Sequence, residues 1–153
     1  MNGAAAVAEI LKREGVEFLI AYPVNSVIEA AARADIRTII VRQERTGIHM
    51  ADAFSRVNSG QKIGVFCMQQ GPGTENSFPG VAQAYSDNVP ILYLPGGPAV
   101  SARSVKPNFS PARTYESVSV SAEVLFQPNQ VASVMRRAFH ALRNGRPGPV
   151  IVE

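Results

Sequence analysis

Residues 62–73, with the sequence KIGVFCMQQGPG, decide the fold class of this chain. The run of residues 62–68 is apolar almost throughout and lacks the alternation of a half-exposed strand, so it predicts a strand buried on both faces. Gly71 and Gly73 enclose a proline in a tight turn, where positive φ angles are expected at both glycines. The turn leads into a helix that should continue to about Tyr85. A buried strand, a turn and a helix in this order are the repeating unit of a parallel sheet.

The same unit recurs on both sides of this stretch. Buried strands are predicted at residues 16–21, 38–41, 91–94 and 149–152, with an irregular strand within 117–126. Helical patterns cover residues 4–14, 26–33, 44–57 and 129–143. Right-handed crossovers then predict an α/β fold with three layers, in which a doubly wound and mainly parallel sheet carries helices on both faces. Residues 95–112, rich in Gly, Pro, Ser and Asn, predict a long loop that is either functional or disordered.

Two local patterns refine the helices. Ser26 and Glu29 have the spacing of a capping box, so Ser26 is expected to cap the second helix. Met50, Phe54 and Val57 recur on one side of the third helix and are expected to form its apolar face.

Length and composition fit one domain, and we assign residues 1–153 to it as a whole. Hydrophobic residues make up 46% of the chain and charged residues 18%, which excludes a disordered chain. No apolar run approaches the roughly 18–20 residues of a membrane-spanning helix, and the first residues lack the basic flank of a secretory signal. The single cysteine, Cys67, cannot form an internal disulfide, which suits a reducing compartment. We therefore expect a cytoplasmic protein without membrane contact.

The charges give no sign of a nucleic-acid partner or a metal site. The net charge of +3 comes from 15 Lys and Arg against 12 Asp and Glu, and the arginines are scattered rather than gathered on one stripe. His49 and His140 lie far apart in the sequence, without the spacing of metal ligands. The chain stops at Glu153, directly after a strand-like run. This end suggests a piece of a longer chain, or a subunit that works with a separate partner.

Small and polar residues follow four of the predicted strands. In an open parallel sheet, ligands bind outside the carboxyl ends of the strands, so these residues predict a shallow ligand cleft. They are Tyr22, Pro23, Val24, Asn25 and Ser26 after the first strand, Arg42, Gln43, Glu44 and Arg45 after the second, residues 69–76 after the third, and Gly96, Gly97 and Pro98 after the fourth.

Glu44 is the sharpest candidate for chemistry, and two interpretations of it stay open. A carboxylate in the first turn of a helix gains about 0.3–1 kcal/mol from the helix dipole, which requires no function. Alternatively, a carboxyl group held in an apolar cleft can share a proton with a heterocycle. Cys67 is expected to be a buried, inert thiol, and Asp52 a residue of the helix surface.

Taken in order, the strand-end motifs resemble one family. They are Ala21-Tyr22-Pro23, Arg42-x-Glu44, the helix from His49 to Arg56, Gly71-Pro-Gly-x-x-Asn76, Ala84-Tyr-Ser-Asp-x-x-Pro-Ile91, and the run from Ala138 to Val152. Over essentially its whole length, the chain resembles the N-terminal, pyrimidine-binding domain of thiamine-diphosphate-dependent enzymes, nearest the acetolactate synthase group. The resemblance implies the flavodoxin-like thiamine-diphosphate-binding fold.

The resemblance also implies a cofactor and a role for Glu44. In this family thiamine diphosphate lies between the pyrimidine-binding domain of one subunit and the diphosphate-binding domain of another, so a homodimer or homotetramer is expected. A glutamate at the position of Glu44 hydrogen-bonds the aminopyrimidine ring and activates the cofactor as the catalytic residue. Tyr22, Pro23, Gly71 and Asn76 would line the pyrimidine or support it. Mg²⁺ would be held by the partner domain, no residue of this chain is expected to bind metal, and FAD is an option that no motif indicates.

Differences from the family bear on the substrate. Asn25 stands where a glycine is usual, and Gln69 and Gln70 replace the usual Thr-Ser, so these three residues are candidate substrate contacts. The resemblance implies a lyase or transferase that decarboxylates or joins small 2-oxo acids, while the differences put acetolactate formation itself in doubt.

Two other functions stay open. A flavodoxin-like domain could bind a mononucleotide such as FMN in the strand-end cleft. A non-catalytic homologue could serve structure or regulation, although the presence of Glu44 argues against that role.

Overall fold

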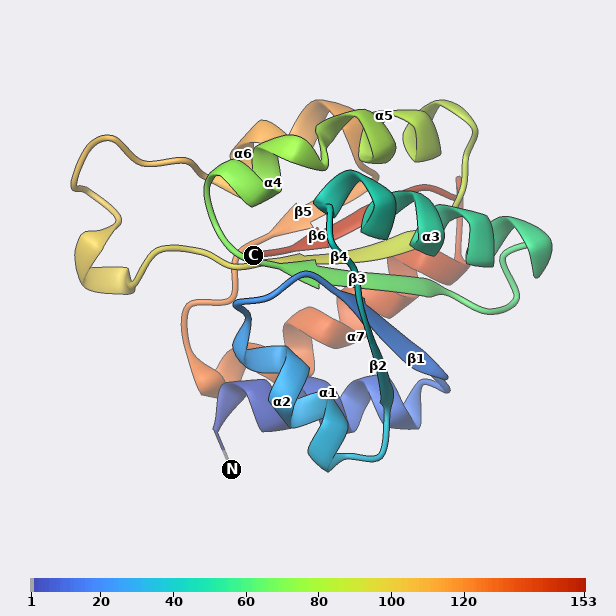
Figure 1. Ribbon diagram of the computed structural model, residues 1–153, viewed down its shortest axis with the longest axis horizontal. Coiled ribbons are helices and arrows are strands. Elements are labelled where there is room, and N and C mark those ends of the chain that lie inside the picture. The colour runs from blue at the N-terminus through green and yellow to red at the C-terminus, as the bar shows by residue number, and fades with distance from the viewer. Residues whose placement is uncertain (1) are drawn as a thin grey trace.

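The computed structural model describes residues 2–153 and has three layers (Figure 1). A six-stranded, all-parallel sheet has the order β2-β1-β3-β4-β6-β5. Helices α1, α2 and α7 cover one face, and α3, α4, α5 and α6 lie on the other. The sequence-based prediction of a doubly wound, flavodoxin-like α/β fold is therefore confirmed.

The elements agree closely with the predicted pattern. The strands are β1 Phe18–Ala21, β2 Arg37–Ile40, β3 Gly64–Met68, β4 Ile91–Pro95, β5 Ser121–Glu123 and β6 Val150–Val152. The helices are α1 Gly3–Arg13, α2 Ser26–Arg33, α3 Glu44–Val57, α4 Pro72–Asn76, α5 Phe78–Ser86, α6 Pro111–Thr114 and α7 Val131–Arg143. Short 3₁₀ turns cover Val100–Ala102, Glu116–Val118 and Pro128–Gln130.

The central strands of the sheet are buried on both faces. All residues of β3 and β4 are buried, as the unbroken apolar runs predict for strands covered by helices on both sides. Leu19 and Val65 pack toward α1 and α7, whereas Ile20 and Phe66 pack toward α3 and α5. This rigid centre fixes the strand ends from which the candidate site is built.

Two predictions about helices α2 and α5 are wrong. Asn25, not Ser26, caps α2: its Oδ1 accepts a hydrogen bond from the Val27 amide at 2.9 Å, so the expected capping box is absent there. The helix expected to run on to Tyr85 is two helices, because the chain turns at Ser77 between α4 and α5.

The apolar face expected on α3 is not the face that the sheet covers. Val57 is 81% exposed, while Met50 and Phe54 are partly exposed. Phe54 instead packs edge-on against Phe18 near the edge of the sheet, with ring centroids 4.6 Å apart. Apart from Ile48, the buried face carries small and polar residues, because α3 lies close to both β3 and α5. The buried residues are Glu44, Gly47, Ile48, Ala51, Asp52 and Ser55.

The long loop between β4 and α6 extends away from the sheet (Figure 1) and carries the turn Val100–Ala102. Among the helices of the described chain, none is both long and apolar enough to span a membrane.

Candidate functional site

Glu44 lies at the carboxyl edge of the sheet, as the first residue of α3, directly after the turn that follows β2. Only 8% of the residue is exposed. Asn76, the last residue of α4, donates a hydrogen bond from Nδ2 to Oε2 of Glu44 at 3.3 Å. The two side chains line a cavity of about 260 Å³ together with Gln43 and Arg45. The structure thus brings together two of the residues singled out by the sequence, Glu44 and Asn76.

The carboxyl group of Glu44 forms no ion pair with a Lys, Arg or His among the described residues, although the exposed Arg45 lines the same cavity. A buried carboxylate is normally paired with a cation or supplied with several donors. Glu44 has one amide donor and a cavity beside it, so it can exchange a proton or a hydrogen bond with a guest that enters the cavity.

The turn after β3 leads into α4, which ends at Asn76 and so brings this residue to the cavity. Gly71 has φ +71°, where a side chain would strain the backbone, as predicted. Gly73 does not have a positive φ, so that part of the prediction is wrong; it is needed for space instead. A Cβ at Gly73 would lie 2.6 Å from Cε of Met68 and 3.0 Å from Oε1 of Glu44.

A buried polar network holds α4 in place beneath the site. Tyr115 donates a hydrogen bond to the carbonyl of Thr74. The Thr74 hydroxyl donates to the carbonyl of Gln69 at 3.0 Å, and the Tyr93 hydroxyl donates to Sδ of Met68 at 3.1 Å. Burial raises the pKa of both Tyr93 and Tyr115, so both stay protonated donors. No local sequence pattern indicates these supports, because Thr74 and Tyr115 are 41 positions apart.

The three candidate substrate residues lie together beside the Glu44 cavity. Asn25, Gln69 and Gln70 line a cavity of about 470 Å³ between the ends of β1, β3 and β4. Nδ2 of Asn25 donates to the carbonyls of Met68 at 2.9 Å and Leu94 at 3.2 Å, so its amide is used inside the protein. The two glutamine side chains form no such internal bonds among the described residues.

Gln70 also lines a third cavity, of about 530 Å³, on the other side of the turn. Gly71 and Pro107 lie on its wall, so Gly71 is at the cleft but not in the Glu44 cavity. Tyr22 is half-buried and Pro23 is exposed, and neither lines any of these three cavities. The backbone amide of Tyr22 donates to the carbonyl of Cys67 at 3.0 Å, which fits a supporting position.

Cys67 is fully buried in β3, as predicted. Desolvation raises the pKa of its thiol to about 12, so the reactive thiolate does not form at neutral pH. Within residues 2–153, no group of three or more His, Cys, Asp or Glu side chains could hold a metal ion.

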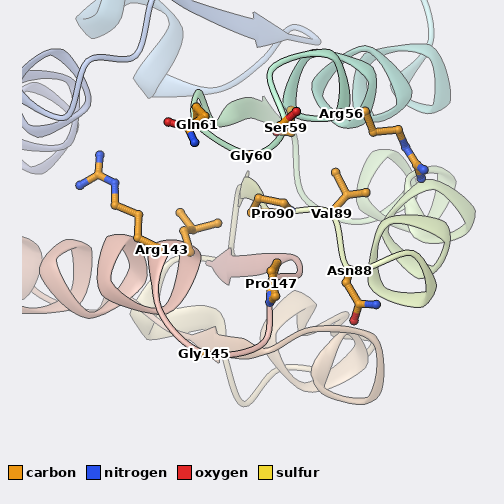
Figure 2. Close-up of a pocket in the computed structure, with 12 residues that line it drawn as sticks. Arg56, Ser59, Gly60, Gln61, Asn88, Val89, Pro90, Arg143, Gly145 and Pro147 are labelled. Carbon is orange, nitrogen blue, oxygen red and sulfur yellow. The ribbon is translucent and has the colours of Figure 1, made fainter.

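A cavity of about 480 Å³ lies at the opposite, amino edge of the sheet (Figure 2). Arg56 and Arg143 extend away from its centre. Arg56 pairs with Asp52 at 2.8 Å and with Asp87 at 2.7 Å, and Arg143 pairs with the carboxylate of Glu14, the residue that follows α1. Its charged groups are thus neutralised within the fold, and the carboxyl edge is the better candidate for chemistry.

Comparison with known proteins identifies the family of this chain. Residues 1–118 match the family model described as "Thiamine pyrophosphate enzyme, N-terminal TPP binding domain". The chain is 28% identical to an acetolactate synthase large subunit of Haemophilus influenzae and 31% identical to one of Parasynechococcus marenigrum. It is 29% identical to the acetolactate synthase isozyme 3 large subunit of Escherichia coli. These alignments cover 100% of the chain but 27%, 26% and 27% of the relatives, so the chain spans about a quarter of their length.

Proposed function

The chain belongs to the thiamine pyrophosphate enzymes, as their N-terminal TPP-binding domain, and on that premise we propose that Glu44 binds and activates the aminopyrimidine ring of thiamine diphosphate. The observation that supports this most is a carboxyl group that is 8% exposed, lacks a cationic partner and borders a cavity. Residues 1–153 would be the pyrimidine-binding domain of a larger enzyme. The reaction would be decarboxylation or joining of small 2-oxo acids, as in the acetolactate synthase group.

The residues around Glu44 fit an aminopyrimidine. The ring offers a basic nitrogen, which needs a carboxyl group free of any competing guanidinium or ammonium group. Gly73 lets the backbone pass close to Oε1 of Glu44, since a Cβ there would lie 3.0 Å from that oxygen and crowd it. Asn76 fixes Oε2 by its amide hydrogen bond, so the carboxyl group keeps one orientation.

Each residue then has a definite task. Glu44 holds or releases a proton at the ring nitrogen, and burial keeps water from competing for it. Asn76 and the α4 turn orient the carboxyl group, while Tyr115 holds the turn from below. When bound, thiamine diphosphate supplies an electron sink for the carbon skeleton of the 2-oxo acid.

The substrate would bind next to the ring, on the side of Gln69 and Gln70. Their amide groups are free to bond the oxygens of a 2-oxo acid, whereas the amide of Asn25 shapes the cavity from within. Tyr22, Pro23 and Gly71 would support the pyrimidine from the rim.

The rest of the cofactor site would come from another domain. Mg²⁺ and the diphosphate would be held by a diphosphate-binding domain, in a homodimer or homotetramer. We use the term assembled enzyme for this chain together with that domain, whether the two are linked in one polypeptide or combined as separate chains. No feature of the described residues favours FAD as an additional cofactor.

The test is turnover of pyruvate by the assembled enzyme. We expect CO₂ release that depends on both thiamine diphosphate and Mg²⁺. An assembled enzyme that binds the cofactor and consumes none of a series of small 2-oxo acids would contradict the proposal. Titration of the isolated chain with FMN separates the alternative, since a flavodoxin-like module binds FMN without a second domain and this chain should not.

A further inference from the structure

We propose that Glu153 is a positioning residue that fixes residues 96–110 as a wall of the substrate cavities. The inference rests on the proposed function, because those cavities are the ones assigned above to the 2-oxo acid. Residues 96–110, called here the β4–α6 segment, follow β4 at the carboxyl edge of the sheet.

Glu153 directly follows β6, and its side chain is only 1% exposed. Oε1 accepts a hydrogen bond from Nη1 of Arg103 at 2.9 Å. Oε2 accepts hydrogen bonds from the Ser110 hydroxyl at 3.2 Å and from the Ala112 amide at 3.0 Å. At the start of the segment, a Cβ on Gly97 would lie 2.8 Å from Oε1. One carboxyl group therefore contacts the beginning, the middle and the end of the segment.

Apart from the Gly96 amide, which donates to the Met68 carbonyl at 2.8 Å, and Phe109, which packs against the core, the β4–α6 segment has few other ties to the domain. It extends outward from the sheet (Figure 1), and Val100 and Val105 are 60% and 62% exposed. Asn108 bonds only to carbonyls within the segment, those of Ala102 and Arg103. The domain therefore holds the middle of the segment in place mainly through Glu153. Because Glu153 is buried, its hydrogen bonds to Arg103 and Ala112 are strong.

Arg103 is held from a second side. Its guanidinium lies 4.7 Å from the ring centroid of Phe126, in a cation–π arrangement. The carboxylate and the aromatic ring together fix one geometry for the middle of the segment. Because a buried charge without its partner is costly, removing either member of the Glu153–Arg103 pair should release the segment.

The segment contributes to the cavities on both sides of Gln70. Gly96, Gly97 and Ala99 line the cavity that contains Gln69, while Pro107, Asn108 and Phe109 line the one next to Gly71. A shift of the segment changes the shape of both. Glu153 should therefore affect which 2-oxo acid fits, while the Glu44 cavity, to which the segment contributes no residue, stays as it is.

The experiment compares Glu153→Gln with the control Glu123→Gln, which removes the exposed ion pair between Glu123 and Arg137. In the folded, assembled enzyme, trypsin cleavage after Arg103 should become about tenfold faster in Glu153→Gln and stay unchanged in the control. For a series of 2-oxo acids with lengthening side chains, the ratio of KM values between long and short members should change by about threefold or more, with kcat for pyruvate retained.

Arg103→Lys serves if Glu153→Gln does not fold, because it keeps a cation near the buried Glu153 carboxylate but removes the guanidinium that bonds Oε1 and lies over Phe126. It should change the KM ratio in the same direction. Equal cleavage rates in Glu153→Gln and wild type, or unchanged KM ratios in both variants, would overturn the inference. If the wild-type enzyme consumes no 2-oxo acid, the proposed function fails, and the cleavage rate alone still decides whether Glu153 holds the segment.

Discussion

Helix α3 carries two buried carboxylates whose surroundings differ completely. Glu44, in the first turn, is 8% exposed and is bonded only to the amide of Asn76. Asp52, two turns later, is 5% exposed and bonds the guanidinium of Arg56 at 2.8 Å. The hydrogen bonds that Arg56 donates to Asp52 and then to Asp87 raise the pKa of Arg56, so this cation stays charged and neutralises Asp52. Burial is thus common to both residues, and the absence of an ion pair marks Glu44 as the candidate for chemistry.

The two edges of the sheet repeat this contrast. The cavity at the amino edge, about 480 Å³, is larger than the Glu44 cavity, about 260 Å³. Its arginines are nevertheless all engaged with carboxylates of the fold. Volume does not identify the site here; a buried carboxyl group that borders a cavity and has no ion-pair partner among the described residues does.

The largest expected effect is on turnover, which should depend on Glu44 and not on Asp52. Glu44→Gln keeps the shape and the contact to Asn76 but removes the exchangeable proton. Turnover of a 2-oxo acid by the assembled enzyme should fall by about a thousandfold, a typical contribution of a general acid–base group. The free energy of unfolding should change by less than about 1 kcal/mol, because Glu44 loses no ion pair. Steady-state kinetics and urea denaturation measure the two quantities.

Asp52→Asn should give the opposite pattern. Loss of the charge leaves Arg56 with Asp87 alone and should lower the free energy of unfolding by about 2 kcal/mol. Turnover per folded molecule should stay within about twofold of wild type. A variant that is inactive although fully folded would break the comparison, since Asp52 would then share the role assigned to Glu44.

Cys67 extends the comparison of buried titratable groups, because desolvation is the one cause of the shift in its pKa. Desolvation raises the pKa of the thiol from 9.0 in the unfolded chain to about 12 in the fold. The stability linked to the protonated thiol is complete below about pH 9 and is lost as the pH rises toward 12, by at most about 1.4 kcal/mol per pH unit. Urea denaturation between about pH 9 and about pH 10 should show this fall, and Cys67→Ala should flatten it. An equal slope in both proteins would mean that other groups, such as Tyr93, dominate.

Much of the fold could be predicted, because it depends on patterns within short stretches. Continuous apolar runs locate the strands, and the start of α3 at Glu44 agrees with the predicted helix 44–57. The predictions are wrong where contacts between residues distant in the sequence decide which side chains are buried. The buried face of α3 carries Gly47, Ile48 and Ala51 rather than Val57, and its small residues allow the close approach of α5.

The candidate site was predictable only in part for the same reason. Glu44 follows from its place at a strand end, and Asn76 from the motif that includes Gly71. The supporting groups Tyr115 and Glu153 act over 41 or more positions in the chain, so no local pattern can indicate them. Asp52 was expected on the surface, since an acidic residue in a helix gives no sign that a second helix covers it.

The most direct test measures the proton at C2 of thiamine diphosphate bound to the assembled enzyme, by ¹H NMR of its exchange in D₂O. Compared with wild type, the exchange rate should fall about a thousandfold in Glu44→Gln and stay within about twofold in Asp52→Asn. An exchange rate in Glu44→Gln within about threefold of wild type, with the cofactor still bound, would contradict the role of Glu44.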